Sequence, residues 1–440
     1  MNRVNLKIVE FDKLKKSSSI KSFFNRSIIE INALRVAEKI INDVKTNGDI
    51  ALFKSILKYD NVDLNSKTIK ISESDIQSAI KSVDKSFKNA VNYAIKNITE
   101  YSKASLKKSW SRKTKNGGLI GENFIPIQRV GAYIPGGSAP LVSTALMTVK
   151  LAKIAGVNEI VACSPASKDG SLNPHIIYAL HKSGATEIFK VGGAHSIAAM
   201  AYGTKSIKSV NKIVGPGGPY VTAAKKIVYG DVSVDMVAGP SEIAILADSS
   251  ANPKFVAADL LSQAEHGTGL EKALLICTSI KQAKAVKSEV LNQYKTLSRK
   301  KIINDVINNG MLIIVVNNIV DGIELINDFA PEHMELIVKN PKKIIPLIKT
   351  AGALFIGPWT PECVGDFIAG PSHVLPTGGT CKYFSGLTVD DFRRRMSVIE
   401  YKKEDLKESL NAIEVFGKIE TLDAHSRSAT IRFGRGDKIV

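Results

Sequence analysis

The stretch SEIAILADSSANPKFVAADLLSQAEHG, Ser241–Gly267, shows the chain's recurring structural pattern most clearly. Its apolar run SEIAILAD is typical of a buried strand, and a helical pattern follows it. Asn252 and Pro253 are residue types favoured at the cap and first turn of a helix, and Gly267 is typical of a helix end. The stretch therefore predicts a strand, a turn and a helix, the unit from which parallel α/β sheets are built.

Similar apolar runs alternate with helical patterns from Gly131 onward. They read IVACSP (160–165), EIFKVGG (187–193), NKIVGPGG (211–218), KALLICTS (272–279), MLIIVV (311–316), MELIVK (334–339) and GALFIGP (352–358). These runs are too many for one small sheet, so we predict an α/β fold with two doubly wound, Rossmann-like modules of mainly parallel strands. Up to about Arg129, apolar residues recur at helical spacing, which predicts a helical N-terminal region.

The same patterns predict four parts of the chain. Residues 1–25 form an N-terminal extension, and 26–128 together with 238–387 form a first α/β domain. Residues 129–237 form a second α/β domain, and 388–440 form a small C-terminal tail domain. No fixed-period repeat or low-complexity linker is visible.

The composition is that of an ordinary globular protein, with 44% hydrophobic residues in a chain of 440. No signal-like segment opens the chain and no run approaches the ~18 apolar residues of a membrane span, so we expect a cytoplasmic protein without a membrane partner. The four cysteines lack C-x-x-C spacing, which argues against a disulfide framework or a thiolate zinc site. The net charge of +18 is spread along the chain, so we expect no nucleic-acid partner.

Polar side chains collect where predicted elements end. Gln263 and His266 share one face in the last turn of the helix described above, where both can reach a common atom. An imidazole is a common zinc ligand and an amide oxygen a weaker one, but such a pair alone is more often a polar helix end. Glu332 and His333 precede a predicted strand. There they can act as a general acid and a general base, or they can simply form an exposed polar turn.

Two later segments also place a histidine near a carboxylate. Asp366 and His373 flank a Gly-Pro turn in GDFIAGPSHVLPTGG (365–379), and Glu420 and His425 lie in IETLDAHSRSATIR (419–432). Ordinary loop chemistry explains the first pair, and an isolated histidine like the second is more often structural.

Glycine-rich turns follow three apolar runs and precede helical patterns. They read YIPGGSAP (133–140), VGGAHSIAAMAYG (191–203) and VGPGGPY (214–220). Backbone amides at such turns can bind a pyrophosphate. None reads G-x-G-x-x-G, so simple turn geometry stays an alternative.

Taken together, these segments resemble the histidinol dehydrogenases. The resemblance rests on VDMVAGPSEIAILADSSANPKFVAADLLSQAEHG (234–267), and on GAYIPGGSAPLVSTALM, VGPGG, APEH, GDFIAGPSHVLPT and the late AH, which occur in the family's order. It covers nearly all residues from about Ile29 to Arg435. It implies one zinc ion per site, bound by Gln263, His266, Asp366 and His425. It also implies a homodimer in which His425 completes the site of the partner subunit.

The implied reaction is oxidation of L-histidinol to L-histidine through the aldehyde with two NAD+, the last steps of histidine biosynthesis. His333 is the implied base toward the hydroxyl, and Glu332 activates water against the aldehyde. Zinc would hold the substrate's imidazole and amine and so orient the reacting carbon. The implied substrate contacts are Ser241, Gln263, His266, His333, Asp366, His373, Glu420 and His425.

Two implied cofactor contacts depart from the family pattern. Tyr133 matches the tyrosine of YIPGG, but His195 stands at the usual glutamine of GGAQ and Gly218 at the usual asparagine of GPGN. Each lost amide removes a hydrogen bond to NAD+ worth roughly 0.5–1.5 kcal/mol. We therefore expect rebuilt cofactor contacts beside intact zinc and substrate positions.

Three other functions stay open from the sequence. The first is a zinc and NAD dehydrogenase of the same fold that acts on another amino alcohol or polyol. A zinc hydrolase leaves the glycine turns unexplained. A nucleic-acid-binding protein lacks clustered aromatic residues or a recognised module.

Overall fold

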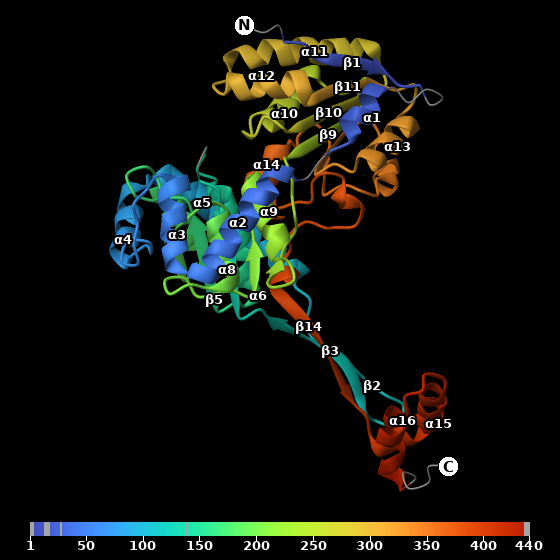
Figure 1. Cartoon of the computed structure of the whole chain (residues 1–440). Helices are drawn as coiled ribbons and strands as arrows, with labels where there is room; N and C mark the ends of the chain where they lie inside the picture. Colours follow the sequence, from blue (N-terminus) through green and yellow to red (C-terminus); the bar gives the residue numbers. More distant parts are fainter. Residues whose placement is uncertain (1–3, 13–17, 27–28, 137–138, 435–440) are drawn as a thin grey trace. The chain divides into compact units, whose positions relative to one another are not determined.

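The computed structural model of the protein describes residues 4–12, 18–26, 29–136 and 139–434 (Figure 1). The chain divides into two compact units. One contains Met1–Ser105 and Ile127–Phe392, and the other contains Leu106–Pro126 and Arg393–Val440. Within the described ranges, no helix has the length and apolar character needed to cross a membrane.

Sheet A of the first unit has six parallel strands in the order β1–β11–β10–β9–β12–β13. Their bounds are β1 Lys7–Glu10, β9 Glu242–Ala247, β10 Lys272–Cys277, β11 Met311–Val315, β12 His333–Ile337 and β13 Ala353–Ile356. Side chains of β9 alternate between two hydrophobic cores, with Ile243 and Ile245 in one and Ala244 and Leu246 in the other. Both faces of this sheet are therefore buried.

Helices supply the rest of both cores. The core of Ile243 contains residues from α10 Pro253–Ala264, α11 Ile280–Gln293 and α12 Lys300–Asn309. The core of Ala244 contains residues from α1 Ser18–Phe24 and α13 Ile319–Phe329. Figure 1 shows these two helix layers around sheet A. This arrangement is a doubly wound module.

Sheet B of the first unit has five parallel strands in the order β6–β5–β4–β7–β8. Their bounds are β4 Arg129–Tyr133, β5 Glu159–Ser164, β6 Glu187–Lys190, β7 Lys212–Val214 and β8 Ser233–Val234. One face packs on α2 Ile31–Asn47, α8 Gly193–Tyr202 and α9 Pro219–Val228. Helix α6 Val142–Ala155 packs on β4 and β5 and contacts α5 Lys85–Ser105 and α7 Pro174–Ser183. The predicted class, two doubly wound parallel modules, is confirmed.

Helix α1 packs on sheet A, whereas the following helices of the N-terminal region belong to the sheet B module. Helix α2 contacts α8 and α9, and the shorter α3 Asp49–Ser55 and α4 Glu73–Ser82 contact α8 and α7. The sequence pattern grouped these helices with residues 238–387. Which sheet a helix covers depends on contacts between residues distant in the sequence. The spacing of apolar residues within a helix cannot predict those contacts.

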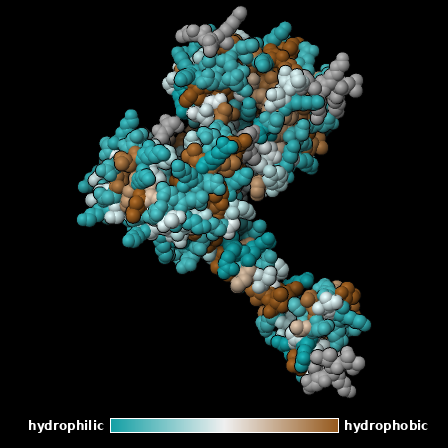
Figure 2. Space-filling view, in the orientation of Figure 1, coloured by the Kyte–Doolittle hydropathy of each residue, from teal (hydrophilic) through white to brown (hydrophobic). Residues whose placement is uncertain are grey.

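The second unit holds a three-stranded antiparallel sheet in the order β14–β3–β2. Its elements are β2 Trp110–Lys113, β3 Leu119–Pro126, β14 Arg393–Glu400, α15 Lys403–Ile419 and α16 Asp423–Thr430. Several large apolar side chains are exposed in this unit, including Ile399, Phe416 and Ile419, and Figure 2 shows hydrophobic surface on it.

Candidate active site

The two sheets of the first unit present different strand ends to the candidate site. In sheet B, the glycine-rich turns follow the carboxyl ends of β4, β6 and β7. In sheet A, Ser241 directly precedes β9, and Glu332 directly precedes β12, which begins at His333. Ligands of open α/β sheets usually bind at the carboxyl ends of the strands. Sheet B follows this rule, whereas the residues of sheet A lie at the amino ends of their strands.

A cavity of about 370 Å³ is lined by residues from both sheet modules. Thr144 and Pro216 come from the sheet B module. The sheet A side contributes Ser241, His266, Glu332, His333, Glu362, Asp366 and His373. The cavity therefore gathers most of the polar residues singled out from the sequence.

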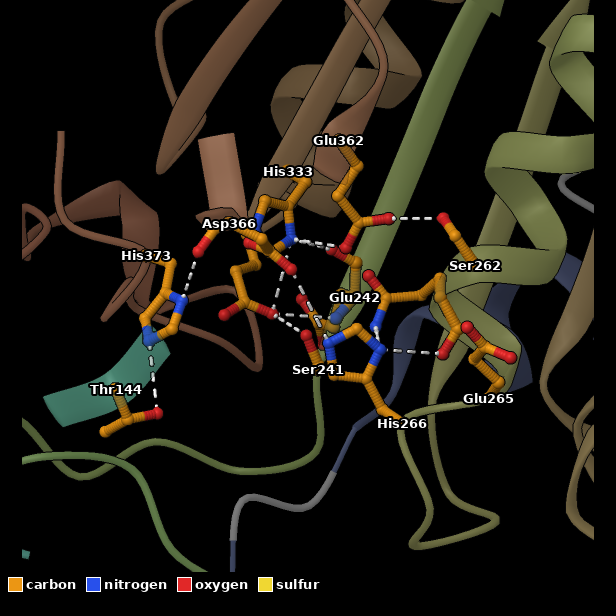
Figure 3. Close-up of polar contacts among 12 residues, drawn as sticks. Thr144, Ser241, Glu242, Ser262, Glu265, His266, His333, Glu362, Asp366 and His373 are labelled. Carbon is orange, nitrogen blue, oxygen red and sulfur yellow. Dashed lines mark hydrogen bonds and ion pairs between the residues drawn. The ribbon is translucent and has the colours of Figure 1, made fainter. Parts of the chain in front are cut away.

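The two ring nitrogens of His333 have different environments (Figure 3). Nδ1 lies 3.0 Å from the carbonyl oxygen of Glu242, so in the neutral ring the Nδ1–H donates to that carbonyl. Nε2 has no hydrogen-bond partner among the residues that the structure describes and lies 3.4 Å from Asp366 Oδ1. The lone pair on Nε2 is therefore the one that can accept a proton.

Charges around His333 favour its protonated form. Burial lowers the pKa of His333, but the carboxylates of Glu332, Glu362 and Asp366 outweigh burial and raise the pKa well above its usual value. A cation bound beside these carboxylates would reduce that effect.

Glu332 is a buried carboxyl held by two hydrogen bonds. Its Oε2 accepts from the Ser241 hydroxyl at 2.5 Å and from the Glu242 amide at 2.8 Å. Burial raises the pKa of Glu332 to about 7, although nearby His333 lowers it. A carboxyl with a pKa near neutrality exchanges protons at physiological pH and can serve as a base toward water.

Glu362 is a second buried carboxyl beside His333, and the sequence analysis did not single it out. It begins α14 Glu362–Phe367, and its Oε1 lies 3.4 Å from His333 Nδ1 while its Oε2 accepts from the Ser262 hydroxyl at 3.0 Å. Burial raises the pKa of Glu362 to about 8. The available sequence signal was its spacing of four residues before Asp366, which places both on one helix face.

Three side chains form a candidate metal centre. His266, Glu362 and Asp366 each offer one ligand atom, and these atoms lie within 4.8 Å of one another. Burial raises the pKa of Asp366, but neighbouring His333 reverses this and lowers the pKa to about 2, so this carboxyl is anionic. An anionic oxygen, an imidazole nitrogen and a further carboxylate are donors that zinc accepts.

Gln263 lies at the edge of this centre. Helix α10 ends at Ala264, so Gln263 lies in its last turn, whereas His266 lies just beyond the helix end rather than inside it. The His266 Nδ1 lies 3.4 Å from the Gln263 Nε2, and Gln263 Oε1 is buried without a partner in the described part of the chain. A buried amide oxygen left unpaired is costly, so this atom fits a bound cation.

His373 uses both ring nitrogens in hydrogen bonds. Nδ1 lies 3.0 Å from the Asp366 carbonyl oxygen and Nε2 lies 3.2 Å from the Thr144 hydroxyl (Figure 3). In the neutral ring, the Nδ1–H donates to this carbonyl and Nε2 accepts from the Thr144 hydroxyl. Burial agrees with this, because it lowers the pKa of His373. The ring links the two sheet modules beside the cavity.

The predicted cofactor residues lie in the turns of sheet B. Tyr133 is buried at the end of β4, and its hydroxyl accepts from the Gly193 amide at 3.4 Å. His195 is 1% exposed, and its Nε2 lies 3.1 Å from Asp60 Oδ2. Gly218 precedes α9, and a Cβ added there meets no described atom within 4 Å. His195 is thus engaged with Asp60, whereas the space at Gly218 is open.

Glu420 and His425 belong to the second unit. Glu420 follows the last residue of α15 and His425 lies in α16, and both side chains are exposed. Their predicted roles as substrate contact and zinc ligand stay predictions.

A shared cavity between two parallel α/β modules, lined by a buried carboxyl–imidazole pair and candidate metal ligands, defines a two-module α/β enzyme. Residues 25–433 match the family model described as histidinol dehydrogenase. The chain belongs to the histidinol dehydrogenase family, and it is an oxidoreductase of histidine biosynthesis. The resemblance predicted from the sequence is confirmed.

Individual relatives agree over most of the chain. It is 44% identical over 410 residues to the histidinol dehydrogenase of Caldanaerobacter subterraneus subsp. tengcongensis, covering 93% of this chain and 95% of that protein. It is 46% identical over 394 residues to that of Listeria innocua, covering 90% and 91%. The crystal structure of histidinol dehydrogenase from Elizabethkingia anophelis matches with a TM-score of 0.93 at 33% identity and covers 100% of both chains.

Proposed function

We propose that the protein catalyses the zinc-dependent, NAD+-linked oxidation of L-histidinol to L-histidine through L-histidinaldehyde. The observation that carries this proposal is the orientation of His333. Its Nδ1 is fixed by the Glu242 carbonyl, while its unpartnered Nε2 lies beside Asp366 of the candidate metal centre. A base held in this way can take a proton from a substrate bound at that centre. The relatives' name supplies the substrate, histidinol.

The proposed zinc ligands of this chain are Gln263, His266 and Asp366, with His425 supplied by a second copy. The unpaired Gln263 Oε1 and the anionic Asp366 support this set. When bound, zinc supplies a Lewis acid that orients the imidazole and amine of the substrate and offsets the carboxylate charge that raises the pKa of His333.

NAD+ is proposed as the hydride acceptor, with two molecules used for each histidinol. Its predicted contacts are Tyr133 at the end of β4, His195 in the first turn of α8 and Gly218 just before α9. The first amides of α8 and α9 can face a pyrophosphate. Because His195 Nε2 is bonded to Asp60, we expect His195 to act by holding its turn in place.

The chain's own residues move the protons in both oxidations. His333 Nε2 accepts the hydroxyl proton of the substrate as the carbon loses hydride and becomes an aldehyde. Glu332 then accepts a proton from water as the water oxygen bonds to the aldehyde carbon. Loss of a second hydride from this hydrate gives the carboxylic acid, so one water is consumed. Ser241 and the Glu242 amide hold the Glu332 oxygen during this exchange.

A homodimer with shared sites is part of this proposal. Phe416 and Ile419 of the second unit are 63% and 73% exposed, and exposed apolar side chains gathered on a small unit favour an interface with another chain (Figure 2). Glu420 and His425 lie in the same unit. In the dimer we expect His425 to complete the zinc ligands and Glu420 to meet the substrate's ammonium group.

Formation of NADH from L-histidinol and NAD+ by the purified protein tests the proposal. We expect two NADH per histidinol, loss of activity after chelation and recovery with zinc. A yield of one NADH, or full activity after metal removal, would contradict it. Turnover of other amino alcohols or polyols in preference to histidinol would favour the alternative substrate class.

A further inference from the structure

A buried ion pair lies beside the glycine-rich turn that follows β7. Lys225 belongs to α9, and Asp235 directly follows β8. The Lys225 ammonium contacts Asp235 Oδ1, and the two side chains are 3% and 0% exposed. Neither residue takes part in the proposed proton transfers. Because a buried charge is costly unless it is paired, each of these side chains requires the other.

Both members of the pair also bind the backbone of Gly215, which directly follows β7. The Lys225 Nζ donates to the Gly215 carbonyl oxygen at 2.8 Å. The Gly215 amide donates to Asp235 Oδ2 at 2.7 Å. Gly215 is buried, so both of its polar backbone groups need partners within the protein. The ion pair supplies a partner for each.

The backbone around Asp235 keeps this carboxylate in place. The Asp235 amide donates to the Ile213 carbonyl oxygen of β7 at 3.1 Å. The Met236 amide donates to Asp235 Oδ1 at 2.7 Å. The carboxylate is therefore held relative to sheet B, and through it Gly215 is held relative to the same sheet.

Gly215 has little freedom to move in this turn. Its φ of +110° favours glycine, and a Cβ there would lie 2.3 Å from the backbone oxygen of Tyr133 at the end of β4. Gly218 follows three residues later, where a Cβ would meet no described atom within 4 Å, and α9 begins at Pro219. Open space before the first amides of a helix fits a pyrophosphate. A shift of Gly215 would therefore displace the groups proposed to meet NAD+.

Stability alone does not account for an ion pair at this position. Well-packed apolar side chains of similar volume often stabilise a protein as much as a buried ion pair, or more. A satisfied buried polar network instead favours one arrangement of the segments that it joins. Here it joins α9, the end of β8 and the turn after β7.

We propose that Lys225 and Asp235 are positioning residues, which hold both backbone groups of Gly215 and so fix the turn before α9 for NAD+ binding. This inference rests on the proposed NAD+-linked function. Both side chains are buried under the turn's own backbone contacts, so their effect on the cofactor is indirect.

The test measures NAD+ binding to the zinc-loaded, full-length protein by isothermal titration calorimetry. Lys225→Met keeps most of the side-chain volume but leaves the Gly215 carbonyl without its donor. We expect the Kd for NAD+ to rise about 5–30-fold, because binding must then order backbone that the ion pair ordered beforehand. Zinc affinity, measured by competition with a chromophoric chelator, should not change.

A double variant, Lys225→Met with Asp235→Asn, separates positioning from stability. Lys225→Met alone leaves a buried carboxylate without its ion-pair partner, which is strongly destabilising, whereas the double variant leaves no unpaired charge. We therefore expect the double variant to have a higher Tm than Lys225→Met. We expect its NAD+ affinity to stay weak, because the Gly215 carbonyl still lacks the Lys225 donor.

Val228→Ala serves as the matched control. Val228 lies on α9 three residues after Lys225 and is fully buried in the core of sheet B. We expect this variant to lower Tm without changing the Kd for NAD+. Hydrogen exchange of residues 211–220 in the cofactor-free protein gives a second readout. It should be faster in both Lys225 variants and unchanged in Val228→Ala.

Three results would overturn the positioning role. The first is wild-type NAD+ affinity in the folded double variant, and the second is unchanged hydrogen exchange of residues 211–220 in that variant. The third is an equal loss of NAD+ affinity in Val228→Ala at the same loss of Tm. If the wild-type protein bound no NAD+ although exchange responded as expected, the proposed function would fail instead, so the two failures are distinguishable.

Discussion

Restoring an amide side chain at Gly218 is expected to tighten NAD+ binding. Gly218 precedes α9 with φ −67°, and a Cβ placed there meets no described atom within 4 Å. Asparagine therefore enters without backbone strain or collision. At the start of α9, its amide can donate one hydrogen bond toward a cofactor bound at the turn.

The expected gain follows from one neutral hydrogen bond. Such a bond contributes about 0.5–1.5 kcal/mol, which is a factor of about 2 to 13 in Kd. Asparagine at a helix cap also stabilises the helix by a few tenths of a kcal/mol relative to glycine, so Tm should rise slightly. His195→Gln should differ, because it breaks the buried contact with Asp60 and leaves that carboxylate with one fewer partner. We expect it to lower the free energy of unfolding by about 1–3 kcal/mol.

Isothermal titration calorimetry of the zinc-loaded protein with NAD+ measures the effect directly. Gly217→Asn is the control, because a Cβ at Gly217 would lie only 2.3 Å from Val221 Cγ1 and should distort the same turn. We expect this control to weaken binding. The reasoning is refuted if folded Gly218→Asn binds NAD+ no more tightly than wild type.

Further predictions concern the proton-transfer residues and the dimer. His333→Gln should lower kcat by about 10²–10⁴-fold with zinc content unchanged by metal analysis; near-normal turnover would exclude His333 as the base. Glu332→Gln should stop after the first oxidation, so that product analysis finds aldehyde and one NADH per histidinol rather than two. In the chelated protein, burial raises the pKa of Glu332 from 4.5 to about 7, so the folded state holds this proton more tightly than the unfolded state. This contribution, roughly 3 kcal/mol, is present below pH 4.5 and lost as the pH rises through 7. Denaturant titrations of Glu332→Gln should lack it, and an identical pH profile would count against the raised pKa. Mixing inactive His425→Ala and His333→Gln chains should restore about a quarter of wild-type activity if His425 completes the partner's site, because only mixed dimers then hold one intact site.

The parallel strands could be predicted because most are buried on both faces. Strand β9, for example, is buried along all of Glu242–Ala247, so its apolar run is continuous. Strand β1 was missed because it is an edge strand whose side chains are half-buried or exposed, and Lys7 and Glu10 interrupt its apolar residues. The pairing of β3 with β14 joins residues far apart in the sequence, so no local sequence pattern could predict it.

Residue type and spacing predicted many residues of the candidate site, but not how deeply they are buried. Glu332 and His333 were recognisable as a candidate acid–base pair. The burial that raises the pKa of Glu332 and the carboxylates that raise the pKa of His333 follow from the fold. Glu335 in MELIVK reads as an ordinary polar residue of a strand, although it is almost fully buried. The engagement of His195 with Asp60 joins two segments that lie 135 residues apart in the sequence. Such contacts exist only once the chain has folded.

The proposed acid–base pair, Glu332 and His333, lies at the amino end of a sheet A strand, whereas the glycine turns extend from the carboxyl ends of sheet B. The two sheets have separate hydrophobic cores. Redesign of the turns would therefore not need to repack the residues proposed to handle protons and metal. Under the proposed function, the choice of electron acceptor and the chemistry at the substrate would be separately adjustable.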